Sequence, residues 1–126
     1  NTNAITVSSV TSISMDPPSL LICINKSSRI HDTLTIGSKF CINLLNKDQE
    51  ELSNTCSDED KHDQRFNDKN WNLEDIPFLA NAQANIFCKV DKLSSYHTHT
   101  IVVGLVEDAK FSDNISTLTY VDGEYR

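Results

Sequence analysis

The sequence predicts a β-rich domain, built as a closed or nearly closed barrel with two small helices. Several short segments are either continuously apolar or alternate between apolar and polar residues, which are the patterns of strands. Turn residues separate them, and Asp122-Gly123 is a strong short signal for a hairpin. The 126 residues suffice for one compact domain and are few for two, so we expect a single domain over residues 1–126.

The charge balance limits the partners of the chain. It carries a formal net charge of −7, from 11 basic and 18 acidic side chains, and its hydrophobic fraction is 38%. Nucleic acids and anionic membranes attract clustered Lys and Arg, so this acidic balance argues against both. No apolar run approaches the roughly 20 residues of a membrane helix, and the polar opening is unlike a signal peptide. We therefore expect a soluble, cytoplasmic protein.

Three strands and two short helices are expected in the first half. Residues 4–14, rich in β-branched and hydroxyl side chains, predict a strand running into a loop. Asp16-Pro17-Pro18 then ends this segment, because proline cannot donate to a ladder. The apolar run within residues 19–25 predicts a strand buried on both faces, and residues 40–45 predict a third. Ser27 or Ser28 can cap a helix that ends at Gly37. Asn46 and Gln49 fit a capping box, which predicts a helix from about Lys47 to Asn54.

An acidic stretch, residues 57–75, divides the chain. It holds seven acidic and three basic residues, so we expect a mostly exposed connection with a helical turn. Either a solvated insertion or a binding loop fits its length. Beyond it, residues 82–93 alternate as a strand with one buried face, residues 100–111 predict a strand interrupted by Gly104, and residues 118–126 predict a hairpin.

The four cysteines lack C-x-x-C spacing. Cys23, Cys41 and Cys88 lie in apolar segments, and Cys56 lies at the edge of a polar one. We expect reduced, buried thiols that act as small hydrophobic groups, with a single disulfide as the alternative.

Hydroxyl groups crowd the first predicted strand. Such a segment can donate hydrogen bonds to a planar polar ring, or it can be an edge strand with a polar face. The candidate residues for such hydrogen bonds are Thr6, Ser8, Ser9, Thr11 and Ser12.

A second candidate site follows the next predicted strand, over residues 25–32. The start of a helix presents unpaired N–H groups that bind phosphate, and Ser27, Ser28 and Arg29 would add hydroxyls and a permanent charge. The alternative is an ordinary serine cap with a solvent-facing arginine.

Two histidines, His97 and His99, stand two residues apart and would share one face of a strand. That spacing permits metal ligation, but no carboxylate pattern joins them, so we predict no metal site and one histidine facing a ligand pocket. No G-x-G-x-x-G, P-loop, G-x-S-x-G or H-E-x-x-H motif occurs, so a Rossmann nicotinamide site is unsupported.

Taken in order, these segments resemble the flavin reductase-like domain family, which includes the reductase components of two-component flavin monooxygenases. The family pattern T-x-S-(S/A)-x-x-S-x-S-x-x-P-P fits residues 6–18, and residues 23–31 resemble C-x-N-x-S-S-x-T/S-H, with Ile30 at the T/S position. F-x-V-N-x-L-x-x-x-Q-x-x-L fits residues 40–52, and the R-F…W element fits Arg65-Phe66 and Trp71. H-x-x-x-x-G-x-V fits residues 99–106, and Y-x-x-G-x-Y fits residues 120–125.

The resemblance implies a Greek-key-like, FMN-binding split barrel of the all-β or α+β class, with two or three short helices. It also implies a homodimer that binds FMN or FAD near the subunit interface and takes hydride from NADH or NADPH. A flavin-dependent monooxygenase would receive the reduced flavin. No protein nucleophile is needed, because the cofactors supply the bond-making.

The resemblance also assigns residues. It places Thr6, Ser8, Ser9, Thr11 and Ser12 around the isoalloxazine ring. It assigns binding of the ribityl phosphate to Asn25, Ser27, Ser28 and Arg29, with His31 assisting. His99 would lie on the nicotinamide side as the catalytic group that binds or polarises, and Tyr125 would contact the cofactor or the dimer partner.

Two departures from the family accompany the resemblance. The family has one more strand before the point where this sequence starts, so we expect the N-terminal strand to be missing. Thr98 and Leu105 stand where acidic residues are common in the family.

Two functions are alternatives to flavin reduction. One is a flavin-binding barrel without reductase turnover, and the other is a degenerate barrel that serves as a dimeric interaction module.

Overall fold

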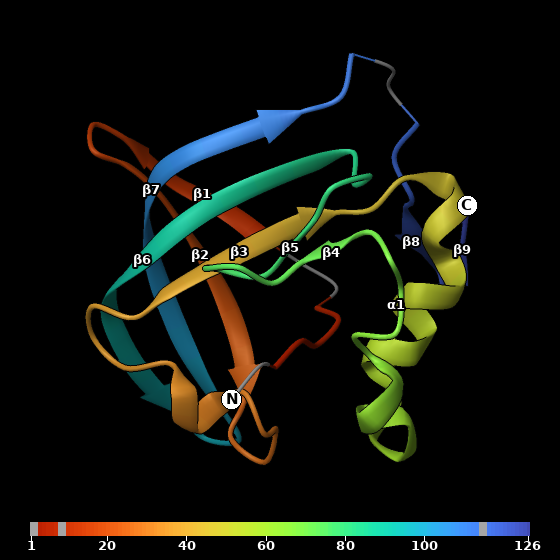
Figure 1. Ribbon diagram of the computed structural model, residues 1–126. Helices are drawn as coiled ribbons and strands as arrows, with labels where there is room; N and C mark the ends of the chain where they lie inside the picture. Colours follow the sequence, from red (N-terminus) through yellow and green to blue (C-terminus); the bar gives the residue numbers. More distant parts are fainter. Residues whose placement is uncertain (1–2, 8–9, 114–115) are drawn as a thin grey trace.

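A five-stranded antiparallel sheet, in the order β1-β2-β7-β6-β3, forms the body of the molecule (Figure 1). The structure is a computed structural model, and it describes residues 3–7, 10–113 and 116–126. The sheet strands are β1 (Val10–Met15), β2 (Pro18–Asn25), β3 (Lys39–Leu44), β6 (Ala84–Tyr96) and β7 (His99–Phe111).

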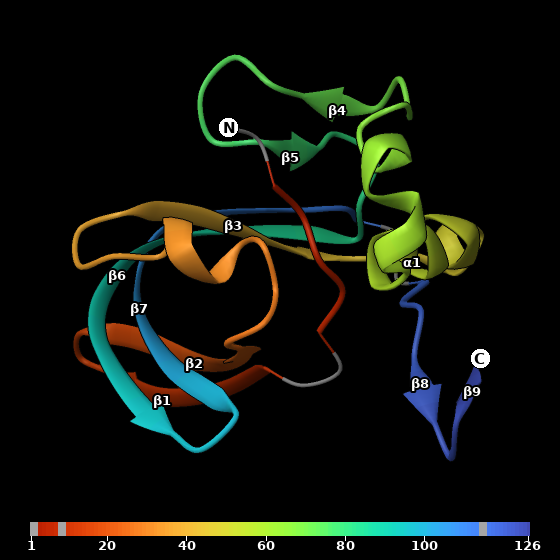
Figure 2. The same cartoon turned by 90° about the horizontal axis from the view of Figure 1, so that it is seen from below.

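The sheet curls into a barrel that stays open along one side. Figure 2 shows β6 and β7 curving from a layer that holds β3 into a second layer that holds β1 and β2. Bulges in the β6–β7 ladder, at Phe87/Cys88 and between Val90 and Lys92, bend the sheet where a regular ladder would stay flatter. Because β1 and β3 are the two edge strands of this sheet, the barrel is split between them. The predicted β-rich barrel is confirmed.

The core lies between the two layers. Leu20, Ile22 and Ile24 of β2 are buried in it, whereas Cys23 on the same strand is exposed and Leu21 is half-buried. The expectation of a strand buried on both faces is therefore wrong, because β2 covers the core with one face only. The remaining core side chains are Leu34, Ile42, Cys88, Val90 and Val102.

Strand β7 runs through Gly104 without the expected interruption. A Cβ at this position would lie 2.8 Å from Phe40 Cζ and 3.1 Å from Cys88 Cβ, so glycine permits the close approach of neighbouring side chains. The residue therefore serves packing within the strand.

The helix expected after Ser27 or Ser28 shrinks to one 3-10 turn, His31–Thr33, whose N-cap is Ile30. Local hydrogen bonds compete with the helix in this segment. Asn25 accepts hydrogen bonds from Ser27 and Ser28. The Ser38 hydroxyl is hydrogen-bonded to the Thr35 hydroxyl and donates to the Thr33 carbonyl.

The second expected helix is confirmed and is slightly longer. Asn46 and Gln49 form the capping box around the 3-10 turn Lys47–Gln49, and α1 (Glu50–Ser57) continues from it. Glu50 and Glu51 in the first turn also favour the positive end of the helix dipole.

The acidic connection is only partly the exposed segment that was expected. It contains a 3-10 helix at Glu59–Gln64 and the short strands β4 (Trp71–Asn72) and β5 (Phe78–Leu79). Arg65, however, is 2% exposed. This basic side chain is held by hydrogen bonds to distant backbone, which the local composition does not reveal.

Strand β6 departs from simple alternation at its start. Asn85 is buried although an outward position was expected, because its amide donates to Asn43 Oδ1 at 2.8 Å and to the Leu79 carbonyl at 3.0 Å. Gln83 is buried as well, and its Oε1 accepts from the Ser116 N–H at 2.7 Å. At this end of the strand, hydrogen-bonded amide side chains therefore occupy buried positions that apolar side chains would otherwise fill.

The two terminal segments lie beside α1. Residues 3–7 cross the open side of the barrel without strand structure, so the strand expected from residue 4 begins only at Val10 (Figure 2). The expected hairpin is confirmed as β8 (Tyr120–Val121) and β9 (Glu124–Tyr125), with positive φ at both Asp122 and Gly123. Within the described residues, no helix is long and apolar enough to cross a membrane.

Candidate functional site

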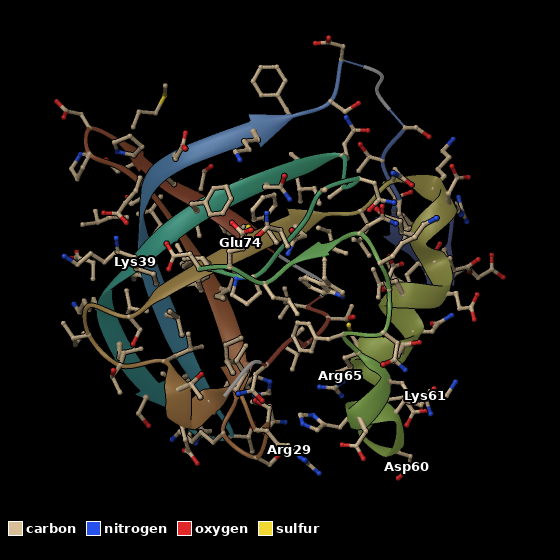
Figure 3. All side chains as sticks on the ribbon, viewed as in Figure 1. Arg29, Lys39, Asp60, Lys61, Arg65 and Glu74 are labelled. Carbon is tan, nitrogen blue, oxygen red and sulfur yellow. The ribbon has the colours of Figure 1, made fainter. Side chains whose placement is uncertain are left out.

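The turn after β2 is organised by Asn25. Its Oδ1 accepts from the Ser27 backbone N–H at 2.9 Å and from the Ser27 hydroxyl at 2.8 Å. Its carbonyl accepts from the Ser28 N–H at 3.0 Å and from the Ser28 hydroxyl at 2.9 Å. Lys26 and Arg29 are exposed on the same turn, and Figure 3 shows Arg29 at the lower edge of the molecule. The turn thus gathers two hydroxyls and two cations.

A neighbouring hairpin fixes the position of this turn. The Lys26 N–H donates to the Thr98 carbonyl at 2.9 Å, and the Lys26 ammonium bonds the Ser95 hydroxyl. Ser95 and Thr98 lie at the end of the β6–β7 hairpin, whose strands pair over almost their whole length. The turn is therefore attached to one of the most extensively paired parts of the sheet.

The predicted residues at this end divide between the two faces of the sheet. Asn25 pairs with His99, and both are exposed, whereas the neighbouring Ile24 and Thr100 are buried. His31 lies on the inner side, where its Nε2 is 2.8 Å from Thr100 Oγ1. His31 and Thr100 also line a small cavity of about 260 Å³, together with Leu34, Leu93, Ser95 and Val102.

The two neighbouring histidines do not share a strand face as expected. His97 sits in the turn between β6 and β7 with a φ of 51° and packs edge-on against Tyr96 at 4.5 Å, so only His99 belongs to the strand. His99 Nδ1 lies 2.8 Å from Thr98 Oγ1. The described residues contain no group of three or more His, Cys, Asp or Glu side chains that could hold a metal.

The hydroxyl-rich segment is not one continuous surface. Thr11 and Ser12 are exposed on β1, while the Thr6 hydroxyl, farther back, donates to the Ser53 carbonyl of α1 at 2.7 Å. Ser8 and Ser9 lie outside the described residues. Thr6 therefore faces α1, and only Thr11 and Ser12 of the described set lie on the exposed strand.

Tyr125 joins the same cluster beside α1. Its hydroxyl lies 2.7 Å from Ser53 Oγ, and its ring packs against Tyr120 at 5.1 Å. Thr6, Ser53 and Tyr125 line a large cavity of about 1530 Å³ that also reaches Ile30 and Thr33 beside the Asn25 turn. Tyr125 thus lines this cavity, whereas the turn residues 25–29 do not.

The sequence prediction missed three residues at these places. The Ser53 carbonyl accepts from the Thr6 hydroxyl, and the Ser53 hydroxyl is hydrogen-bonded to the Tyr125 hydroxyl. The Thr100 hydroxyl is hydrogen-bonded to His31 Nε2, and Arg65 donates to the Ala4 carbonyl. Arg65 had a signal in the R-F…W pattern, because Trp71 Nε1 donates to the Arg65 carbonyl at 2.9 Å. Ser53 and Thr100 carry no local signal, since their partners lie 47 to 72 residues away.

Three of the thiols, Cys41, Cys56 and Cys88, are not poised for nucleophilic chemistry. Burial raises the pKa of Cys41 to about 12 and that of Cys88 to about 11, with further increases from Cys88 and Glu107 respectively. Burial also raises the pKa of Cys56, although the nearby Arg65 opposes this. All four thiols are free, as expected, but Cys23 is exposed on β2 rather than buried.

Comparison with known proteins places the barrel among flavin reductases. The chain is 35% identical over 125 residues to the reductase component of the FADH2-dependent resorcinol hydroxylase from Rhizobium sp. strain MTP-10005, covering 98% of this chain and 70% of that protein. It is 32% identical to the FMN reductase (NADH) RutF of Pantoea ananatis, covering 95% and 64%. The NADH:FAD oxidoreductase SgcE6 of Streptomyces globisporus superposes with a TM-score of 0.87 at 29% identity, covering 97% and 74%.

Residues 1–126 also match the family described as the flavin reductase like domain. The chain belongs to this family, and the expected family, fold and enzyme class are confirmed. The individual site residues remain predictions.

Proposed function

We propose that the chain catalyses the reduction of a flavin by NADH and passes the reduced flavin to a partner monooxygenase. The observation that carries this proposal is the family match over residues 1–126, which includes the segments that form the Asn25 turn and β7. Relatives named for NADH, FMN and FAD, and one named as a hydroxylase component, support the choice of substrates and partner.

The Asn25 turn fits a flavin phosphate. Ser27 and Ser28 hydroxyls now donate to Asn25, and rotation about one bond lets each donate to a phosphate oxygen instead. Lys26 and Arg29 supply positive charge in a chain whose net charge is −7. Thr11 pairs with Leu21 and extends this polar surface along the outer face of the sheet, whereas Ser12 pairs with Leu20 and alternates to the opposite face.

The protein's own contribution is to hold and orient the reactants. A bound flavin and nicotinamide supply the hydride chemistry. His99 lies beside Asn25 on the outer face, which suits a residue that binds or polarises the nicotinamide side. His31 is held against Thr100 on the inner face and therefore supports the turn from below. Tyr125 lines the large cavity, and its role in this proposal is contact with the cofactor or with the dimer partner.

A homodimer would complete this site. Ile13 and Met15 of β1 are 50% and 93% exposed, which leaves apolar side chains uncovered next to the proposed ring-binding surface. A second copy would bury them. Light scattering on the purified protein tests this part, with a dimer as the expected result and a monomer at micromolar concentration as the contrary one.

Anaerobic titration tests the activity. We expect FMN or FAD to bind and its visible absorption to bleach on addition of NADH, with NADPH as the comparison donor. Binding without bleaching would favour the flavin-binding barrel that lacks turnover. Absence of binding to either flavin at micromolar concentration would refute both functions and favour an interaction module.

A further inference from the structure

Arg65 is the largest fully buried side chain among the described residues. A buried guanidinium is costly unless its charge and its five N–H donors are satisfied. The ion pairs found among the described side chains are His31–Asp32 and Lys39–Glu107, and neither includes Arg65. Its Nε also lacks a hydrogen-bond partner. Burial of the Arg65 guanidinium therefore costs folding free energy, and core packing alone does not explain why an arginine occupies this position.

The partners of Arg65 are backbone carbonyls from two separate segments. Nη1 donates to Ala4 O at 2.7 Å, and Nη2 donates to Asp58 O at 3.1 Å. Figure 3 shows Arg65 on the inner side of the acidic connection, whereas Asp60 and Lys61 lie on its outer side. The guanidinium thus links the N-terminal segment to the end of α1.

Among the described residues, a few contacts hold residues 3–7 in place. Residues 3–7 belong to no strand or helix, so no ladder satisfies their backbone. Ile5 and Val7 pack against the core, and Thr6 donates to the Ser53 carbonyl. Two hydrogen bonds therefore fix the segment that leads into β1. Arg65 donates to the Ala4 carbonyl, and Thr6 donates to the Ser53 carbonyl of α1.

We propose that Arg65 is a positioning residue for the flavin site: it anchors residues 4–7, which lead toward Thr11 and Ser12, the residues of β1 assigned to the flavin ring. The inference rests on the proposed function. If the anchor is lost, flavin binding must itself order residues 3–7, which weakens affinity. Once flavin is bound, the reactants are held as before, so turnover at saturating flavin should change little.

Arg65→Lys tests the anchor while keeping the charge. An ammonium lacks the planar fork that reaches two carbonyls at fixed spacing. We expect the flavin Kd and KM to rise at least about 10-fold, while kcat at saturating flavin stays within about twofold. Arg65→Gln, which buries no charge, should behave alike and serves if the lysine variant does not fold.

Trp71→Phe is the matched control. It removes the indole donor from the Arg65 carbonyl and leaves the guanidinium on Ala4, so it perturbs the same buried cluster without releasing the anchor. We expect its flavin Kd to stay within about twofold of the unaltered chain at a comparable loss of melting temperature. An equal loss of flavin affinity in both variants would mean that stability alone is responsible, and would overturn the proposal.

Hydrogen exchange provides a measurement on the unaltered chain. Flavin should slow amide exchange at residues 4–7 and also at 58–65, although the latter are assigned no flavin contact. Unchanged exchange at 58–65 on flavin binding would overturn the link. A chain that binds no flavin at all would instead refute the proposed function, so the two failures are distinguishable.

Discussion

Asn25 shows how one side chain can set the geometry of a site. Its carboxamide and carbonyl oxygens accept four hydrogen bonds from the next two serines, so the turn is held by local contacts rather than by a helix. The sequence analysis predicted a helix cap in this segment, and the structure has an Asn-centred turn instead. A helix cap and an Asn-centred turn share the same residue types, and only the backbone path distinguishes them.

Asn25→Asp separates the shape of the turn from its charge. The carboxylate can still accept from Ser27, so folding stability should change little. It also places a negative charge beside the proposed phosphate site, which should weaken FMN binding by about 1–3 kcal/mol. Fluorescence titration with FMN measures this effect.

Riboflavin is the control ligand, because it lacks the phosphate. Its affinity for the N25D variant should match its affinity for the unaltered chain. A similar loss for riboflavin and FMN would refute the phosphate assignment. Lys69→Ala, which removes an exposed cation in the acidic connection, controls for a general change in net charge.

Arg65 marks the limit of sequence reasoning at the same scale. A basic residue within an acidic stretch is typical of a solvated surface. Its burial depends on Ala4, which is 61 residues away in the sequence. The family pattern drew attention to the residue, but only the folded chain shows which carbonyls it holds.

At the scale of elements, Gly104 links strand β7 to the packing of β3. We expect Gly104→Ala to lower the free energy of unfolding by about 1–3 kcal/mol, because the new methyl group would press on Phe40 and Cys88. Urea unfolding measures the loss. Shortening the obstructing side chain in Gly104→Ala/Phe40→Leu should recover part of it.

Gly37→Ala is the comparison for this prediction. Gly37 has a φ of 88°, and a Cβ added there would have no atom within 4 Å, so its substitution costs backbone strain without crowding. Phe40→Leu should not rescue that variant. Equal rescue of both glycine variants would contradict the packing explanation for Gly104.

Elements with local determinants were the ones that the sequence predicted well. The capping box at Asn46 and the turn at Asp122-Gly123 each depend on a few consecutive residues. Residues 4–7 were wrongly assigned to a strand, because β-branched composition favours a strand but cannot supply a partner. Here the Arg65 guanidinium donates to the Ala4 carbonyl, which a ladder would otherwise have used, and the Thr6 hydroxyl donates to the Ser53 carbonyl of α1.

At the scale of the whole molecule, buried thiols make stability sensitive to alkali. The pKa of Cys41 is raised from 9.0 to about 12 in the folded chain, and that of Cys88 to about 11. Above pH 9 the unfolded chain releases protons that the folded chain retains, so stability falls as the pH rises through this window. Below pH 9 both states keep the protons, and this effect is absent.

Cys41→Val should remove part of that dependence. Between pH 8 and pH 10, we expect the free energy of unfolding to fall by about 1 kcal/mol less in the variant than in the unaltered chain, after allowance for the partial exposure of Cys41. Urea unfolding at both values measures the difference.

The overall architecture was predictable as a class but not as a topology. Strand patterns indicated a barrel, whereas the order β1-β2-β7-β6-β3 joins β2 to β7, which lies far along the chain. Periodicity reports which face of a strand is buried and carries no information about its neighbour. The family resemblance supplied what the periodicity lacked.

The long β6–β7 hairpin also bears on how this chain folds. Its two strands of 13 residues each are joined by His97 and Thr98, so their pairing closes only a short loop. β2 and β3 then add to its two sides through contacts that are distant in sequence. We expect this hairpin to be already formed in the folding transition state. The N-terminal half then assembles on it.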